Sequence, residues 1–140
     1  MQRSNNLCRM KEMPNCIFCK IVLGDIPSTK VYEDEHFLVF TDIHPQSPGH
    51  VQVIPKKHFR FVWDMPDVSA MSPNIGSYFS VVRKVARAMQ GAFGTDYVFS
   101  KVMGDEVPHA HVWLFPHPTY AQGDPQDFEG NAEKIRSALR

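Results

Sequence analysis

Residues 72–94, SPNIGSYFSVVRKVARAMQGAFG, form the longest stretch of helical periodicity in the chain. Ser72 can cap a helix, Pro73 suits its first position and Gly94 suits its far end. Between them, apolar side chains recur at three- and four-residue spacing, as one buried face of a helix requires. These side chains are Ile75, Phe79, Val82, Val85, Ala86, Met89 and Phe93. We therefore predict one long amphipathic helix between Ser72 and Gly94.

The segments on either side of this helix predict strands and a short terminal helix. Cys16–Val22 is a short apolar run, Asp34-Glu35 predicts a tight hairpin, Pro55 ends the third strand, and Phe128–Leu139 predicts the terminal helix. Strands grouped in hairpins, with one long helix between two of them, indicate an α+β fold with an antiparallel sheet. The five expected strands are Lys30–Glu33, His36–Ile43, His50–Ile54, Tyr97–Met103 and Pro108–Phe115.

The composition indicates one globular domain and excludes several classes of protein. The 140 residues are 43% hydrophobic and 21% charged, which excludes wholesale disorder. Lys+Arg 15 balances Asp+Glu 15, so no basic excess exists to bind nucleic acid through its phosphates. No apolar run approaches the ~20 residues that cross a bilayer, and the N-terminus lacks the apolar core of a signal peptide. We expect a cytoplasmic protein without nucleic-acid or membrane partners.

The first residues differ in character from the rest of the chain. Residues 1–14 are polar and show no periodicity, so we predict a disordered N-terminal extension followed by one domain at 15–140. This extension holds Met1, Met10 and Met13, each of which can serve as the start methionine.

Three cysteines, Cys8, Cys16 and Cys19, cannot pair completely and so favour a reducing compartment. Cys16 and Cys19 have the two-residue spacing of a metal knuckle. Redox sites share this spacing, but they open a helix within a thioredoxin-like βαβ pattern, which the sequence lacks. From the spacing alone, a zinc site and a metal-free pair both stay open.

The chemistry of the chain concentrates in His109-Ala110-His111-Val112-Trp113-Leu114-Phe115. On a strand, alternate side chains point to opposite faces, so His109, His111 and Trp113 share one face while Ala110 and its alternates enter the core. Two imidazoles about 7 Å apart beside the Gly104-Asp105-Glu106 turn indicate a metal site or a catalytic site. The alternative is a partly exposed strand whose histidines satisfy local polar groups.

Several short motifs, taken in order, resemble those of the histidine triad (HIT) nucleotide-binding proteins. The resemblance covers residues 15 to about 118 and is specific because the order and spacing of all the motifs agree. It implies a HIT-like fold, with about five antiparallel strands, one long helix and short N- and C-terminal helices. The motifs are Cys16-Ile-Phe-Cys19-Lys20-Ile21, Gly24-Asp25-Ile26-Pro27-Ser28, Val31-Tyr32-Glu33-Asp34-Glu35, Phe40-Thr41-Asp42-Ile43-His44-Pro45, Pro48-Gly49-His50, Val53-Ile54-Pro55-Lys56-Lys57-His58 and Val107-Pro108-His109-Ala110-His111.

The resemblance implies a reaction and a nucleophile. Members of the family transfer a nucleoside monophosphate unit from phosphoanhydrides or phosphoramidates to water, and the middle histidine, His111 here, is the nucleophile. A neutral imidazole can attack phosphorus if an acceptor holds its other ring N–H and so fixes the tautomer. The implied ligand is a purine nucleotide or nucleotide conjugate.

The resemblance also implies a binding site. Asp42 matches the acidic residue that accepts hydrogen bonds from the ribose hydroxyls, although an Asp before a turn can simply cap that turn. Ile43 would line the base pocket together with Phe18, Ile21 and Phe40, which are equally compatible with an ordinary core. His50 supports the phosphate site or starts a strand structurally, and Gly104 suits close approach of backbone to phosphate.

A subgroup of the family completes its CxxC pair with two histidines. The matching positions imply a structural zinc held by Cys16, Cys19, His58 and His109. Two thiolates and two imidazoles make a closed tetrahedral site with no position for a catalytic water. A catalytic zinc on His109 and His111 is the poorer alternative, because the cysteines already supply two ligands.

Two departures from the family pattern favour alternative functions. Trp113 stands where the family has its third histidine, and an indole offers one donor and no titratable proton. Asp105 and Glu106 place carboxylates where relatives have neutral donors to the phosphates. Besides a hydrolase or transferase, the sequence therefore allows a nucleotide-binding protein with weakened catalysis, or a zinc-structured interaction module.

We also expect a homodimer. The resemblance implies a symmetric pair formed through the long helix and an adjacent strand, and twofold pairing is the commonest oligomer. Tyr78, Val81 and Met71 lie off the main apolar stripe of the helix region and would need burial.

Overall fold

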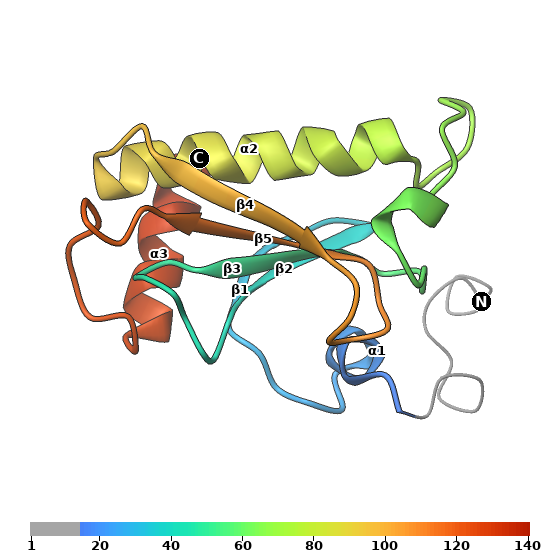
Figure 1. Cartoon of the computed structure of the whole chain (residues 1–140), viewed down its shortest axis with the longest axis horizontal. Coiled ribbons are helices and arrows are strands. Elements are labelled where there is room, and N and C mark those ends of the chain that lie inside the picture. Colours follow the sequence, from blue (N-terminus) through green and yellow to red (C-terminus); the bar gives the residue numbers. More distant parts are fainter. Residues whose placement is uncertain (1–14) are drawn as a thin grey trace.

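A computed structural model describes residues 15–140. The predicted extension at 1–14 lies outside the described residues. Five antiparallel strands form one sheet in the order β1-β2-β3-β5-β4, accompanied by three α-helices and a short 3₁₀ turn, which confirms the α+β fold (Figure 1). The elements are α1 (Ile17–Leu23), β1 (Lys30–Glu33), β2 (Phe37–Thr41), β3 (Val51–Pro55), η2 (Val62–Asp64), α2 (Ile75–Phe93), β4 (Val98–Met103), β5 (His111–Pro116) and α3 (Phe128–Leu139).

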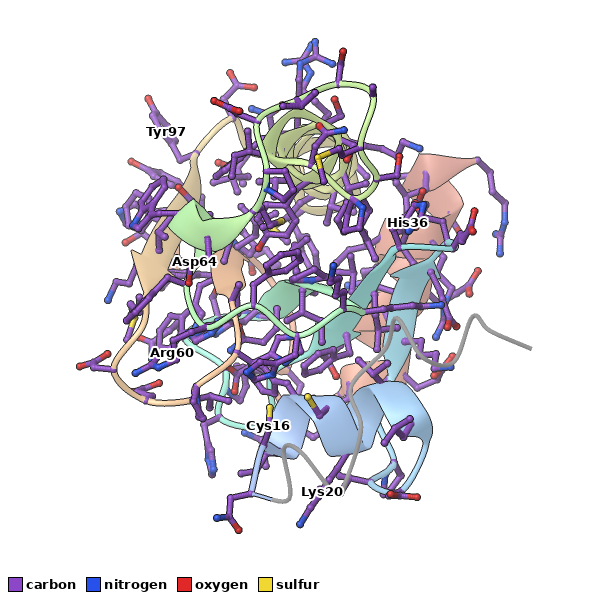
Figure 2. All side chains as sticks on the ribbon, turned by 90° about the vertical axis from the view of Figure 1, so that its right-hand side faces the viewer. Cys16, Lys20, His36, Arg60, Asp64 and Tyr97 are labelled. Atoms are coloured by element: carbon purple, nitrogen blue, oxygen red, sulfur yellow. The ribbon has the colours of Figure 1, made fainter. Side chains whose placement is uncertain are left out.

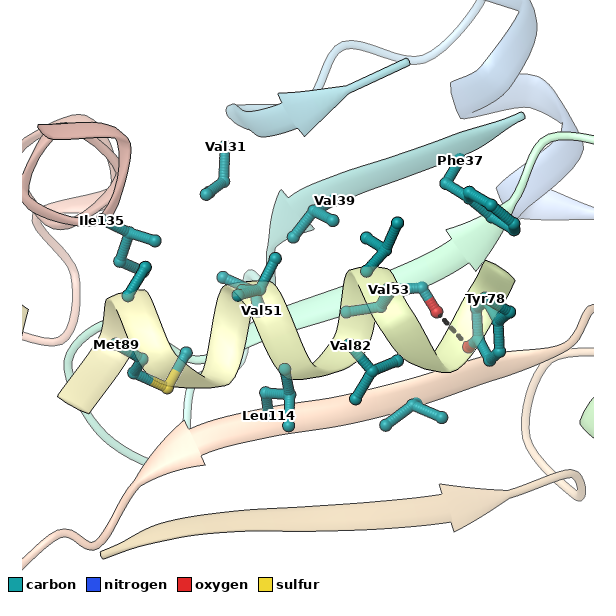
Figure 3. Close-up of a cluster of buried hydrophobic side chains, with 14 of the residues drawn as sticks. Val31, Phe37, Val39, Val51, Val53, Tyr78, Val82, Met89, Leu114 and Ile135 are labelled. Carbon is teal, nitrogen blue, oxygen red and sulfur yellow. Dashed lines mark hydrogen bonds between the residues drawn. The ribbon is translucent and has the colours of Figure 1, made fainter. Parts of the chain in front are cut away.

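The long helix covers one face of the sheet, and α1 lies on the other (Figure 1). Beneath α2, side chains from β1, β2, β3 and β5 form the main core (Figure 3). The hydroxyl of Tyr78, fully buried in α2, donates to the carbonyl of Val53 at 2.6 Å and so ties the helix to the middle of the sheet. Ala110, Val112 and Leu114 belong to this core, as the alternation predicts.

The opposite face carries a second, smaller core built around α1. Because both faces are covered, every residue of β2 and of β3 is buried. A strand of this kind reads as a continuous apolar run rather than as an alternating one. The members of this second core are Cys16, Phe18, Cys19, Ile21, Leu38, Phe40 and Ile54.

The long helix begins later than the sequence predicts. Asn74 is the N-cap: its side chain accepts from the backbone of Ser77, whose hydroxyl accepts in return from the backbone of Asn74. This reciprocal pair satisfies two of the free N–H groups at the helix start. The prediction of Ser72 as cap and Pro73 as first residue was therefore wrong by two positions, while Gly94 ends the helix as expected.

The strand boundaries near the histidines also differ. Strand β5 begins at His111, so His109 and Ala110 precede it rather than lie within it. Gly49 sits at φ +87° before β3, and a Cβ there would lie 2.5 Å from the ring of Phe93. Only glycine fits this turn, which sets the position of His50 at the start of the strand.

Two residues expected at a dimer surface lie inside the monomer. Tyr78 and Val81 are buried in the main core, so they give no reason for a partner, whereas Met71 is exposed. Among the described residues, no helix is both long and apolar enough to cross a membrane.

Candidate functional site

Four side chains that are distant in sequence meet between α1 and the start of β5. Cys16 precedes α1 and Cys19 lies in its first turn, while His58 and His109 come from the loops after β3 and before β5. Figure 2 shows Cys16 at the start of α1, on the side that faces the sheet. One ligand atom from each residue lies within 4.8 Å of all the others. The four predicted metal ligands therefore converge on one point.

Individual contacts give this group the geometry of a Cys₂His₂ site. The sulfur of Cys16 lies 3.4 Å from Nδ1 of His109, and the sulfur of Cys19 lies 3.2 Å from Nδ1 of His58. Such separations match the ligand-to-ligand edges expected around a tetrahedral ion with bonds of about 2.0–2.3 Å. The two imidazole rings are perpendicular, so both present the same nitrogen without clashing.

Hydrogen bonds behind the ligands set their protonation. The Nε2–H of His109 donates to the carbonyl of Pro55 at 2.8 Å, which leaves Nδ1 unprotonated toward the thiols. Burial lowers the pKa of His109 to about 3, lowers that of His58 and raises that of Cys16. The histidines are thus held in their ligating form. A bound dication would reverse the effect of burial on Cys16 by holding it as a thiolate.

Beside this group lies a cavity of about 530 Å³, between α1 and the end of β2. This volume is ordinary for a small-molecule site. Its wall contains all four residues expected around a base, and three of them also belong to the second core. These residues are Phe18, Ile21, Phe40 and Ile43.

Asp42 lies in the wall of the same cavity, directly after β2. Its Oδ1 accepts from the backbone N–H of His44 at 2.8 Å, so the turn-capping role is real. Its Oδ2 accepts from the amide of Gln52 at 2.8 Å. Each oxygen keeps a further lone pair, and the carboxylate is held rigidly from two sides.

His111 is buried at the start of β5, behind Phe18, whose ring lies edge-on at 5.3 Å between centroids. It is not among the residues lining the 530 Å³ cavity. The Nδ1–H of His111 donates to the carbonyl of His109 at 2.7 Å. This bond fixes the tautomer and leaves the lone pair on Nε2, which no described residue engages. The nitrogen is therefore prepared to act as a base or a nucleophile.

His50 and Trp113 form a contact pair on the sheet face next to His111. Their ring centroids are 4.8 Å apart. The Nδ1 of His50 accepts from the backbone of Gln46, so its hydrogen lies on Nε2. Neither this atom nor the indole nitrogen of Trp113 has a partner within the described residues, although both are buried. Unpaired buried donors are costly, and they indicate a missing acceptor.

The three residues of the turn before the histidines separate in space. Gly104 and Asp105 line a different groove with Arg60, Phe61 and Trp63, whereas Glu106 lines the 530 Å³ cavity. A Cβ on Gly104 would lie 2.7 Å from the ring of Phe61, and its carbonyl accepts from Arg60. Packing thus explains this glycine, and of the two carboxylates only Glu106 faces the cavity.

Sequence reasoning missed Gln52 and Phe128, which also line the cavity. A glutamine in the middle of the otherwise apolar VQVIP run of β3 was a signal. No sequence pattern marked Phe128 as a cavity residue, because it reaches the cavity only through the packing of α3.

Comparison with known proteins agrees with this arrangement. The HIT domain family matches residues 24–119. The chain belongs to the HIT family. Protein hit of Bacillus subtilis is 44% identical over 115 residues, which cover 79% of this chain and 74% of the relative. An adenosine 5'-monophosphoramidase of Schizosaccharomyces pombe is 31% identical over 137 residues, covering 90% of this chain and 99% of the relative.

A solved HIT structure bears on the metal. The Zn-bound histidine triad family protein of Mycobacterium smegmatis matches this structure with a TM-score of 0.72 at 32% identity, covering 90% of this chain and 94% of that one. That neighbour holds zinc, and in this chain Cys16, Cys19, His58 and His109 converge into a Cys₂His₂ group that could hold a metal ion. Four protein ligands complete a tetrahedral shell, so an ion held there would have a structural role.

Proposed function

We propose that this HIT protein cleaves a nucleoside monophosphate unit from a phosphoramidate or a dinucleoside polyphosphate, through a covalent nucleotidyl-His111 intermediate. The observation that carries the proposal is the hydrogen bond from Nδ1–H of His111 to the carbonyl of His109. In the neutral ring it fixes the tautomer in which the lone pair lies on Nε2. The S. pombe relative named adenosine 5'-monophosphoramidase supports this reaction class.

The reaction proceeds in two displacements at phosphorus. Nε2 of His111 forms a bond to the α-phosphorus, and the bond from phosphorus to the leaving nitrogen or oxygen breaks with its electron pair. The leaving group takes its proton from water, because the indole N–H of Trp113 donates a hydrogen bond but is not a titratable acid. A second water then attacks the same phosphorus and loses a proton to solvent, the P–N bond breaks with its electron pair returning to Nε2, and the neutral imidazole of His111 returns.

Binding residues hold the nucleotide for this attack. Asp42 accepts hydrogen bonds from the ribose hydroxyls, and Ile43 contributes with Phe18 and Phe40 to an apolar pocket for a purine base. The rigidity of Asp42, fixed by the backbone of His44 and by Gln52, favours this role. His50 and Trp113 donate to the phosphate through their unpaired N–H groups. Zinc ties α1 to the loop that carries His109, two residues from the nucleophile.

A second candidate is a nucleotide-binding protein with negligible turnover. Trp113 favours it because an indole cannot protonate a leaving group. Glu106 also favours it, since its carboxylate faces the cavity and would repel a phosphate. In both cases we expect a cytoplasmic homodimer. The outer edge strand β4, whose central residues are exposed, offers a surface for pairing.

The zinc-loaded full-length protein should be incubated with adenosine and guanosine phosphoramidates and with dinucleoside polyphosphates, and the products read by mass spectrometry. Release of AMP or GMP from at least one substrate class supports the hydrolase. Binding of AMP without release from any substrate supports the second candidate. Absence of both would contradict the assignment of a nucleotide to this cavity.

A further inference from the structure

Lys101 lies on the same face of the sheet as the unpaired donors. It is paired with Trp113 across β4 and β5, and Trp113 is paired with Gln52 across β5 and β3. Directly paired residues of an antiparallel sheet project to the same side. The ammonium of Lys101 lies 5.3 Å from the centroid of the Trp113 ring, so its charge stands beside the indole.

No carboxylate within the described part of the chain neutralises this lysine. None of the ion pairs among residues 15–140 includes Lys101. Its charge acts on His50. Burial is the main cause of the lowered pKa of His50, the carboxylate of Asp42 opposes it, and the charge of Lys101 lowers the pKa further. An unneutralised cation on the exposed edge strand β4 therefore stands beside the buried groups of the site.

The groups around Lys101 are mainly donors. His50 Nε2–H and Trp113 Nε1–H are buried without partners. The carboxylate of Asp42 is 3.5 Å from His50 Nε2, near enough for electrostatic attraction but without the geometry of a hydrogen bond. Gln52 Oε1 is the one unpaired buried acceptor of this group, and it suits a hydroxyl or a water. Two free N–H donors beside a free cation match an oxyanion.

We propose that Lys101 is a phosphate-binding residue, which forms with the N–H groups of Trp113 and His50 a cradle for the phosphate of the bound nucleotide. The indole supplies a donor without charge, and the lysine supplies a positive charge with three N–H donors. Contact with the indole face restricts the flexible lysine stem to this side of the strand. The inference rests on the proposed nucleotide site and identifies the group that neutralises its anion.

Calorimetric titration with AMP and with adenosine tests this role, because the two ligands differ only in the phosphate. The zinc-loaded full-length protein should be compared with Lys101→Met, which keeps the stem, and Lys101→Arg, which keeps the charge. Lys84→Met is the matched control, since Lys84 also lies over an aromatic ring, 5.0 Å from Tyr32. We expect Lys101→Met to weaken AMP about 3- to 10-fold, with adenosine changed less than about twofold.

The other variants test the charge and the specificity of the effect. Lys101→Arg should retain most of the AMP affinity of wild type, and Lys84→Met should change the affinity for neither AMP nor adenosine. Raising the salt concentration should weaken AMP binding more in wild type than in Lys101→Met. Equal weakening of AMP and adenosine, or no change in AMP, would overturn the role of Lys101 while leaving the nucleotide site intact. Failure of wild type to bind AMP at all would instead overturn the proposed function itself.

Discussion

The zinc corner and the phosphate face lie on the same side of the sheet but have opposite electrostatic needs. At the zinc corner, four donor atoms of Cys16, Cys19, His58 and His109 point at one another, and a cation satisfies them. At the phosphate face, N–H groups of His50 and Trp113 stand unpaired beside Lys101, and an anion satisfies them. The ligand that each region takes can therefore be inferred from which kind of partner its buried polar atoms lack.

Strand β5 connects the two regions. His109, just before the strand, belongs to the metal-ligand group, and its carbonyl accepts from His111, the first residue of the strand. One backbone carbonyl thus links this group to the tautomer of the proposed nucleophile. Under the proposed function, a structural ion would position His111 through this link rather than react.

The largest effect should come from removing the nucleophile. His111→Ala should lower the rate of phosphoramidate hydrolysis by at least about 10³-fold, because no other described group offers an unprotonated nitrogen at this place. AMP affinity should change little, because the bound nucleotide is held before reaction by Asp42, the base pocket and the phosphate face. Steady-state kinetics and calorimetry check the two parts separately. Hydrolysis that survives His111→Ala would place the nucleophile elsewhere.

Breaking the zinc corner should have the next largest effect. Cys16→Ser removes one of four ligands, so the protein should lose its zinc and its melting temperature should fall by about 10 °C or more. Metal analysis and calorimetric unfolding measure both quantities. Ser80→Ala, at an exposed position of α2 outside the ligand group, is the control. Purified wild type with less than about one-tenth equivalent of zinc per chain would contradict the closed four-ligand site.

The burial of His50 predicts a pH dependence of stability. Burial lowers its pKa from 6.5 to about 4, so between these values the unfolded chain binds a proton that the folded protein does not. Stability is therefore full above pH 6.5 and is lost as the pH falls. From pH 7 to pH 5 the loss should be about 2 kcal/mol, on zinc-loaded protein.

Denaturant unfolding of wild type and His50→Gln across this range isolates the contribution. The glutamine does not titrate, so the difference between the two proteins should shrink by this amount toward pH 5. A difference that stays constant with pH would show that His50 is protonated as easily in the folded protein as in the unfolded chain.

The smallest effect concerns Trp113. Trp113→His adds a titratable donor beside the phosphate, and one preorganised donor is worth about 10²–10³ in rate at best. We expect about a tenfold increase in kcat, because the indole N–H and Lys101 already contribute. Single-turnover kinetics measure the change. An inactive Trp113→His that still binds AMP, together with an inactive wild type, would support the binding protein in place of the enzyme.

Local sequence predicted the zinc corner better than the phosphate face. Cys16 caps the short helix that contains Cys19, and His109 belongs to a specific motif, so the family resemblance could assign them to one metal group before the structure was known. Lys101, Trp113 and Gln52 lie in three strands and meet only through the β4-β5-β3 register. Such pairing depends on the whole sheet, and a lysine within VFSKVM gives no local sign of what it faces. The start of α2 was missed for a different reason, since the Asn74–Ser77 pair outcompetes an equally acceptable cap at Ser72.

The most direct test of the account is the chemical trapping of its intermediate. Zinc-loaded wild type should be mixed with a nucleoside phosphoramidate, quenched under alkaline denaturing conditions during turnover, and digested for mass spectrometry. The account predicts one nucleoside monophosphoryl group per modified chain, located on His111, with none in His111→Ala. Steady product release without any adduct, or an adduct on another residue, would contradict the assignment of His111 as the nucleophile.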